Sequence, residues 1–511
     1  MTVNRENTQM RFTRFSVAVL GLAALSAVAC STDLTSLNTN PNSPTSAPAP
    51  TLFTAATVST LGTFNGSFQT LSMTSLFAQH MAQVQYVDED RGHIRTTTID
   101  GLYAGQYIGP LEDYKKVIDQ GDAAVKPNIS GPARVMQSWV FQNMTDLWGD
   151  IPYSEALGGD VVGGTLKPKY DAQKDIYTGL LKTLTDASVA MGPGISAADP
   201  GLGSADPIYK GDVAKWVKFS NSLRARMALR MIKADPAKAA TELSAALAAG
   251  VISSNADNAM MAWPGDGVYD NPLSANFSTR DDHRVSKTLL DTMIKLGDPR
   301  VSIYAQPTKA DPTVYAGLQN ALDNITVTPF FNTTSRAGAI FYPGATSYGT
   351  FGTSAGKKTP SYVLTFAEVS FIRAEAANRG IAGLTPAQAA AFYDAGVTAS
   401  ITQWGGTAAA AATYLAKPGV AYVPGATGLQ QIGLQKWVAL FTQGTEAWSE
   451  WRRTGNPTTI LPGPKMYSDV LCWPVRLLYS GNEQTVNAVS LAAAIARQGA
   501  DTQCTKVWWA K

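Results

Sequence analysis

The sequence predicts a mainly α-helical protein, in which a helical-hairpin scaffold carries a large irregular, loop-rich half and few short strands. Two observations predict the scaffold: apolar residues recur at helical spacing in several long segments, and short capped turns join two pairs of these segments. A third observation predicts the loops, because residues 252–285 and 302–360 are rich in Gly, Asn, Asp, Pro, Ser and Thr. Isolated aromatic residues within both stretches indicate structured loops, and loops of this length are commonly functional.

The N-terminal residues have the pattern of an export signal. Basic residues precede an apolar run, residues 15–28, and small residues then lead to Cys30. This order is typical of a secretory signal peptide, and the run is too short to span a bilayer with ease. We therefore expect residues 1–29 to be a signal peptide and the thiol of Cys30 to carry lipid at the mature N-terminus. The residues 27–29, Ala-Val-Ala, also fit a plain cleavage site for soluble export, so that alternative stays open.

A tether and a single folded body are expected after the signal. Residues 30–50 contain mainly Ser, Thr, Asn, Pro and Ala, which predicts a flexible lipidated tether. Residues 51–511 are expected to form one α-helical domain, with loop-rich insertions at about 252–360. No later apolar stretch reaches the length of about 18 residues that a membrane span needs. Membrane contact is therefore expected through the lipid alone.

Three helices are expected in the first 200 residues. The first follows Pro110 and has Gly121 as its stop signal. Residues 132–148 and 171–191 each place large apolar side chains along one helical stripe.

Two helical hairpins follow these helices. Residues 215–233 and 236–250 form the first hairpin, with Asp235 as the cap between its helices. Residues 362–378 and 386–401 form the second. Paired helices with short capped turns are the unit of helical-repeat scaffolds, although no strict sequence period is visible here.

The composition limits the possible partners and the role of the cysteines. The formal net charge is only +2 and no tract of Lys or Arg occurs, so the sequence lacks the electrostatic footprint of a nucleic-acid-binding protein. Besides Cys30, the chain contains Cys472 and Cys504. In an oxidising compartment these two residues can pair and staple the C-terminal tail, and two separate thiols are the alternative.

The sequence contains no legible catalytic or metal-binding motif. Residues 352–356 match the pattern G-x-S-x-G, but a hydrolase elbow needs a later histidine, and His80, His93 and His283 all lie upstream. No H-x-x-x-H, C-x-x-C, P-loop or dinucleotide motif occurs. We therefore expect no metal and no cofactor.

Charged residues within the apolar helices are expected to be structural. They occur as a group of arginines in one helix, residues 224–230, and as Glu368, Arg373 and Glu375 in another. Guanidinium and carboxylate groups form forked pairs that fix the register between helices. The segment of residues 446–453, EAWSEWRR, is likewise expected to be a packed helix end.

Several segments, in a fixed order, together resemble the SusD/RagB family of outer-membrane nutrient-binding lipoproteins. The resemblance runs from about residue 50 to the end of the chain, and each motif alone is short. The matching segments are residues 145–156 (TDLWGDIPYSEA), 168–173 (PKYDAQ), 206–212 (DPIYKGD), 219–226 (FSNSLRAR), 367–376 (AEVSFIRAEA), 435–440 (QKWVAL), 446–455 (EAWSEWRRTG) and the terminal Trp508 and Trp509.

The resemblance implies tetratricopeptide-like helical hairpins that support the loop-rich half. It implies a lipid-anchored protein on the outer-membrane surface of a Gram-negative bacterium. Such a protein captures an oligosaccharide or peptide and delivers it to a TonB-dependent, SusC-like transporter, without catalysis. Aromatic faces would stack on sugar rings, while Asn, Asp and Arg side chains would bond to the hydroxyl groups.

The ligand site is expected in the loops, because the family's motifs are mostly structural. The predicted ligand-binding residues are Tyr86, Asp90, Arg91, Trp263, Tyr269, Asn271, Phe277, Asp282, Tyr348 and Phe351. Two other functions stay open. A secreted surface hydrolase would turn over a substrate, and a structural partner of an outer-membrane barrel would bind the barrel without any soluble ligand.

Overall fold

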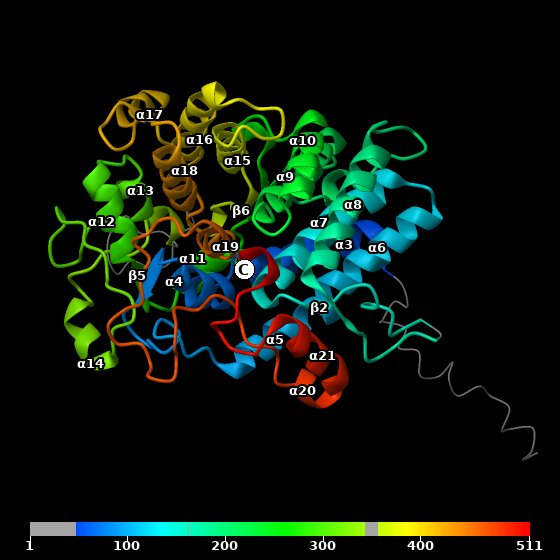
Figure 1. The fold of residues 1–511 in the computed structure, drawn as a ribbon, viewed down its shortest axis with the longest axis horizontal. Coiled ribbons are helices and arrows are strands. Elements are labelled where there is room, and N and C mark those ends of the chain that lie inside the picture. The colour runs from blue at the N-terminus through cyan, green and yellow to red at the C-terminus, as the bar shows by residue number, and fades with distance from the viewer. Residues whose placement is uncertain (1–46, 162, 343–355) are drawn as a thin grey trace, which may run out of the picture. The chain divides into compact units, whose positions relative to one another are not determined.

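Helices dominate the part of the chain that the computed structural model describes, which comprises residues 47–161, 163–342 and 356–511 (Figure 1). The strands are short and pair two by two: β1 (Met81–Gln83) with β5 (His283–Val285), β2 (Ile151–Pro152) with β3 (Tyr170–Asp171), and β4 (Ala259–Met261) with β6 (Ser361–Leu364). The α-helices are α3 (Ala49–Phe64), α4 (Ser75–Phe77), α5 (Thr96–Gln106), α6 (Glu112–Ala123), α7 (Pro127–Trp148), α8 (Gln173–Met191), α9 (Val213–Arg230), α10 (Pro236–Ala248), α11 (Pro272–Phe277), α12 (Lys287–Leu296), α13 (Val301–Tyr304), α14 (Asn324–Val327), α15 (Phe366–Asn378), α16 (Ala389–Gln403), α17 (Ala408–Leu415), α18 (Ala426–Ala439), α19 (Gly444–Thr454), α20 (Glu483–Val486) and α21 (Ala488–Gln498).

The long helices form a continuous array of packed neighbours. Along the chain, α6 packs on α7, α7 on α8, α8 on α9 and α9 on α10, and α9 then contacts α15, which packs on α16 and α18 (Figure 1). This arrangement confirms the predicted scaffold of helical hairpins with few short strands. No helix in the described residues is both long enough and apolar enough to span a membrane.

Capping side chains set where several of these helices begin. The carboxylate of Asp212 accepts a hydrogen bond from the backbone N–H of Lys215, and that of Asp235 accepts one from Lys238. Each bond satisfies an N–H group that the first turn of a helix leaves without a partner. The cap predicted at Asp235 is therefore confirmed.

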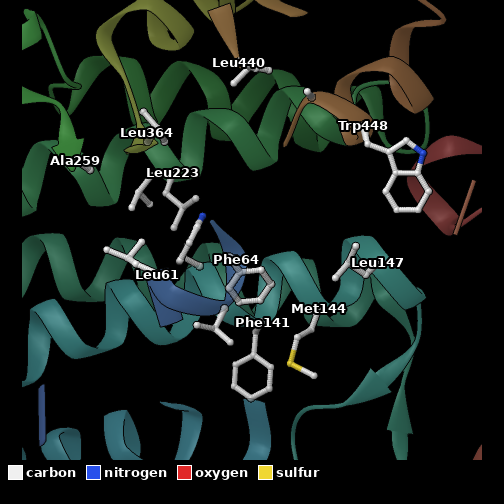
Figure 2. Packing of buried hydrophobic residues seen from close by; sticks show 14 of the residues in the cluster. Leu61, Phe64, Phe141, Met144, Leu147, Leu223, Ala259, Leu364, Leu440 and Trp448 are labelled. Carbon is white, nitrogen blue, oxygen red and sulfur yellow. The ribbon is translucent and has the colours of Figure 1, made fainter. Parts of the chain in front are cut away.

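The core joins residues that lie far apart in the sequence. Figure 2 shows Leu61 and Phe64 of α3 beside Phe141 of α7 and Leu223 of α9. Trp448 of α19 belongs to the same buried cluster and is fully enclosed. The core therefore ties the N-terminal helix to the C-terminal half.

Three predicted helix limits were wrong. The helix predicted to end at residue 233 ends at Arg230. Residues 361–364 form strand β6, and α15 begins only at Phe366, because the Thr365 hydroxyl accepts a bond from the N–H of Glu368 and caps the helix there. Gly121 does not stop α6, which continues to Ala123. A Cβ at Gly121 would lie 2.8 Å from the backbone nitrogen of Ser130, so this glycine permits close contact with α7 instead.

Most of the charged groups predicted to be structural form ion pairs inside the helical array, whereas Arg373 of α15 lies over the ring of Phe392, 4.3 Å from its centre. Arg226 of α9 forms a two-bond fork with Glu368 of α15, at 2.7 and 2.6 Å, and both side chains are buried. Arg453 of α19 forms a similar fork with Glu375, at 2.8 and 2.6 Å. Such pairs hold the register between helices, because loss of one partner would leave a buried charge unpaired.

A disulfide joins the last long loop to the C-terminal tail. The sulfur atoms of Cys472 and Cys504 lie 2.08 Å apart. The two cysteines close a segment that includes α20 and α21.

Candidate functional site

The pairing of β1 with β5 brings two predicted ligand loops together. In this antiparallel register Met81 lies opposite Val285 and Gln83 opposite His283. The ladder continues one step further, since the N–H of Val84 donates to the carbonyl of Asp282 at 2.7 Å. Just beyond this ladder, the guanidinium carbon of Arg280 lies 5.1 Å from the centre of the Tyr86 ring.

Tyr86 presents its ring to solvent from an uncommon backbone conformation. Its side chain is a large hydrophobic group with 64% exposure, and its φ is +54°. Positive φ is rare for a bulky residue and concentrates at functional sites, where the surrounding structure holds the strain. The backbone therefore holds the ring of Tyr86 at the surface, where the packing of the core does not require an aromatic side chain.

Asp282 holds Arg280 beside this ring. The Nε of Arg280 donates to a carboxylate oxygen of Asp282 at 2.5 Å, and the arginine side chain remains 50% exposed. The neighbouring Asp281 pairs instead with Arg284 and Arg336. We call Tyr86, Arg280 and Asp282 the Tyr86 cluster. It combines an aromatic face with guanidinium donors, the groups that bind the apolar face and the hydroxyls of a sugar.

Burial keeps the next residue in this strand uncharged. His283 of β5 is buried, which lowers the pKa of its imidazole to about 3, and the neighbouring arginines Arg284 and Arg280 act in the same direction. At neutral pH the positive charge near the Tyr86 cluster therefore comes from arginine side chains and not from His283.

A second predicted aromatic residue lies on a tight turn. The N–H of Gly265 donates to the carbonyl of Tyr269 at 3.1 Å. The N–H groups of Tyr269 and Val268 donate to the carboxylate of Asp266 and hold its pKa below the usual value. Tyr269 is 49% exposed on this turn, and α11 leads from the turn towards Arg280. It is a second surface aromatic in the same insertion.

Besides Asp282, which is itself only 6% exposed, four of the predicted ligand residues lie in the interior. The carboxylate of Asp90 accepts bonds from the side chain of Asn320 and from the backbone of Ala321 and Gln83. Burial raises the pKa of Asp90 to about 7. The structure therefore places Asp90 as a support that joins β1 to a distant loop.

The other three interior residues shape the insertion itself. The indole N–H of Trp263 donates to the hydroxyl of Ser361 at 2.9 Å, and Asn271 caps the start of α11. Phe277 stacks on Tyr342 with ring centres 4.5 Å apart. Their aromatic and amide groups are occupied by internal contacts, so the exposed surface is provided by Tyr86 and Tyr269.

Arg91 belongs to a separate stack. Its guanidinium carbon lies 3.8 Å from the centre of the Tyr467 ring, and the imidazole of His93 stacks on that ring at 3.8 Å. Two groups cannot occupy one ring face at this distance, so Tyr467 is covered on both faces. Tyr467 also donates its hydroxyl to Asp88 at 2.6 Å. This stack therefore offers no free aromatic face to a ligand.

The helical fold and the ordered sequence motifs agree with a comparison to known protein families. A family model described as "SusD-like: Starch-binding associating with outer membrane" matches residues 41–480, which is most of the sequence. The chain belongs to the SusD-like family. The resemblance inferred from the ordered motifs is thereby confirmed.

Solved SusD-like structures share this fold over nearly their whole length. A protein named as chitin-binding is 28% identical, with a TM-score of 0.76 over 90% of this chain and 99% of its own. A chitin-binding SusD homolog from Flavobacterium johnsoniae is 26% identical, with a TM-score of 0.79 over 91% and 98%. A SusD homolog from Bacteroides uniformis is 24% identical and shows the fold, with a TM-score of 0.76 over 91% and 100%. No curated protein sequence matches this chain.

Some predicted residues of this SusD-like chain cannot be placed. Cys30, Tyr348 and Phe351 lie outside the described residues, as do positions 352–355 of the G-x-S-x-G segment. Within the described residues, no group of three or more His, Cys, Asp or Glu side chains is arranged to hold a metal ion.

Sequence reasoning missed one member of the Tyr86 cluster. Arg280 lies two residues before Asp282, in a run of polar residues without any periodic pattern. Its significance comes from the pairing of β1 with β5, which joins strands about 200 residues apart. A sequence signal for this contact would have required knowledge of the strand register.

Proposed function

We propose that this SusD-like protein captures an oligosaccharide at the outer-membrane surface and delivers it to a TonB-dependent, SusC-like transporter. The observation that carries the proposal is the Tyr86 cluster, in which an exposed aromatic ring is fixed beside an arginine that an aspartate orients. Two relatives named as chitin-binding support a glycan ligand. Chitin oligosaccharides are therefore the first ligands to test.

A sugar suits this surface better than a peptide does. An extended peptide is usually held through its backbone, as an added strand or in a matching groove. The Tyr86 cluster instead offers a ring face with polar groups at its edge, which complements a pyranose ring with its apolar face and peripheral hydroxyls. We therefore favour an oligosaccharide over a peptide as the captured nutrient.

The proposed role contains no chemical step. A lipid on Cys30 would anchor the chain, residues 30–50 would serve as the tether, and residues 51–511 would form one binding domain. The insertions at about 252–360 would provide Arg280, Asp282 and Tyr269 to the ligand site. The family description, which names association with the outer membrane, supports this placement.

Calorimetric titration with chitin oligosaccharides tests the proposal. Tyr86→Ala is expected to bind about tenfold more weakly than the wild type, since an aromatic contact of this kind contributes about 1–1.5 kcal/mol. Ile325→Ala is the matched surface control, because Ile325 is 87% exposed on α14 and lies outside the cluster. Equal affinities of a folded Tyr86→Ala variant and the wild type would contradict the proposed site. Release of shorter sugars during the titration would instead favour a hydrolase.

A further inference from the structure

The charged group that the Tyr86 cluster presents to solvent is the guanidinium of Arg280. Its Nε donates to the carboxylate of Asp282, and the arginine side chain remains 50% exposed. Its terminal amino groups have no hydrogen-bond partner among the residues that the structure describes. A guanidinium carries donors and no acceptor, so these free N–H groups can pair only with a ligand atom that accepts a hydrogen bond.

The carboxylates next to Arg280 are already occupied by arginine side chains. The side chain of Asp282 is buried and accepts the Nε of Arg280. Asp281 is shared between Arg284 and Arg336, whose side chains are both buried. A ligand at the Tyr86 cluster therefore meets free charged donors and no free carboxylate of these two residues.

An exposed carboxylate two residues after Tyr86 belongs to the neighbouring stack. Asp88 accepts the hydroxyl of Tyr467 at 2.6 Å, and the guanidinium of Arg91 lies over the ring of the same tyrosine. The negative charge of Asp88 is therefore accompanied by a positive charge on its own stack. Arg280 remains the charged group that lies beside the ring of Tyr86.

Backbone hydrogen bonds hold Arg280 beside this ring in the absence of a ligand. The N–H of Arg280 donates to the carbonyl of Asn276 in α11 at 3.1 Å, and the N–H of Val84 donates to the carbonyl of Asp282 at 2.7 Å. The guanidinium carbon lies 5.1 Å from the centre of the Tyr86 ring. A sugar ring stacked on Tyr86 would thus bring the substituents at its edge next to the free N–H groups, and the preformed arrangement lowers the ordering cost of binding.

We propose that Arg280 selects saccharides that carry a carbonyl-type acceptor at the edge of the ring that stacks on Tyr86. The acceptor is the acetamido group of an N-acetylated sugar or the carboxylate of a uronic acid, because either offers an oxygen that only accepts and that a planar guanidinium can bind. A protonated amine brings only donors to this position, and a hydroxyl group is the weaker acceptor. The inference rests on the proposed function, because that function supplies the glycan.

Calorimetric titration with four hexasaccharides of β-1,4-linked backbone tests the selection. Cellohexaose, chitohexaose and fully deacetylated chitohexaose carry a hydroxyl, an acetamido group and an amine at the same ring carbon, and a glucuronate hexamer carries a carboxylate. The wild type is expected to bind chitohexaose or the glucuronate hexamer at least tenfold more tightly than cellohexaose and the deacetylated hexamer, as expected for a hydrogen bond to a charged group. The tighter of the two favoured probes identifies the acceptor as acetamido or carboxylate.

The double variant Arg280→Met, Asp282→Asn removes the donors and keeps an apolar stem beside Tyr86. The second substitution is needed because Arg280→Met alone would leave a buried carboxylate without its partner. The variant is expected to bind cellohexaose as the wild type does and to lose the tenfold preference. Arg280→Lys should retain part of the preference, since an ammonium group keeps donors but lacks the planar fork. A merely structural defect would instead weaken binding of all four probes together.

The double variant Arg95→Met, Glu89→Gln is the matched control. The side chain of Arg95 is 59% exposed and pairs with the buried Glu89 at 2.6 Å, so this pair resembles that of Arg280 and Asp282 but lies outside the Tyr86 cluster. The control should keep the preference of the wild type.

Three results would overturn the selection by Arg280. Binding of cellohexaose as tight as that of chitohexaose and the glucuronate hexamer would do so and leave glycan capture in place. A preference for the deacetylated hexamer would show that a carboxylate, such as that of Asp88, faces the ligand instead. A wild type that binds none of the four hexasaccharides would contradict the proposed function together with this inference.

Discussion

Tyr86 combines a strained backbone with an exposed ring, and these two properties can be separated by substitution. Glycine adopts a φ of +54° without the steric cost that a tyrosine meets, which is about 1 kcal/mol or more. The ring of Tyr86 contributes little to the core, since it is 64% exposed. Selection for stability alone would therefore favour glycine at this position, so the tyrosine points to a binding role.

Tyr86→Gly is expected to keep or raise the free energy of unfolding while it weakens glycan binding about tenfold. Tyr86→Phe should bind nearly as the wild type does, because the aromatic face remains. Thermal unfolding and calorimetric titration of the three proteins measure both quantities. A glycine variant that binds normally would show that the ring has no part in recognition.

Asp90 should give the protein a measurable dependence of stability on pH. Its pKa is raised from 3.8 to about 7 in the folded state, chiefly by burial. The folded state therefore binds the proton more tightly than the unfolded state, and this group's contribution to stability falls as pH rises from about 4 to about 7. Above about pH 7 the contribution stays constant.

Asp90→Asn is expected to remove this part of the pH dependence. The variant should lose some stability at every pH, because an amide cannot accept all the bonds that Asn320, Ala321 and Gln83 donate to the carboxylate. The difference in melting temperature between wild type and variant should therefore be largest near pH 4.5 and smaller near pH 7.5. A difference that is independent of pH would show that Asp90 titrates at its ordinary pKa.

The contact between α6 and α7 depends on a glycine that resembles a helix stop in the sequence. A Cβ at Gly121 would meet the backbone nitrogen of Ser130 at 2.8 Å and its Cβ at 2.9 Å. Gly121→Ala should destabilise the protein by about 1–3 kcal/mol, the usual effect of overpacking, although alanine is the better helix former. Denaturant unfolding measures this change.

Gly101→Ala is the matched control for this substitution. Gly101 lies within α5, and a Cβ there would meet no atom within 4 Å. This variant is expected to gain up to about 1 kcal/mol from helix propensity alone. A gain of stability in both alanine variants would show that the contact between α6 and α7 has room for a Cβ at position 121.

The sequence predicted the helical elements better than the contacts between loops. Helical spacing and the cap at Asp235 are local signals, and they located the long helices to within a few residues. The strand Ser361–Leu364 was missed because its partner, β4, lies about 100 residues away. Tyr86 and Asp282 were predicted as ligand residues one by one, whereas their link through Arg280 depends on the register of β1 and β5. Interior roles for Trp263 and Asn271 likewise depend on tertiary contacts.

The proposed capture site and the helical array have separate roles in the molecule. The Tyr86 cluster presents an exposed aromatic ring and a guanidinium group in the loops that flank the paired strands β1 and β5. The helical array, with its buried ion pairs, forms the framework.

The most direct test of this account is the recovery of the tagged, full-length protein from detergent-solubilised outer membranes, with mass spectrometry of the proteins that accompany it. The account predicts a TonB-dependent barrel transporter in stoichiometric amount. A protein that is recovered alone, under conditions in which it still binds chitin oligosaccharides, would contradict delivery to a transporter and leave a free-standing surface binder.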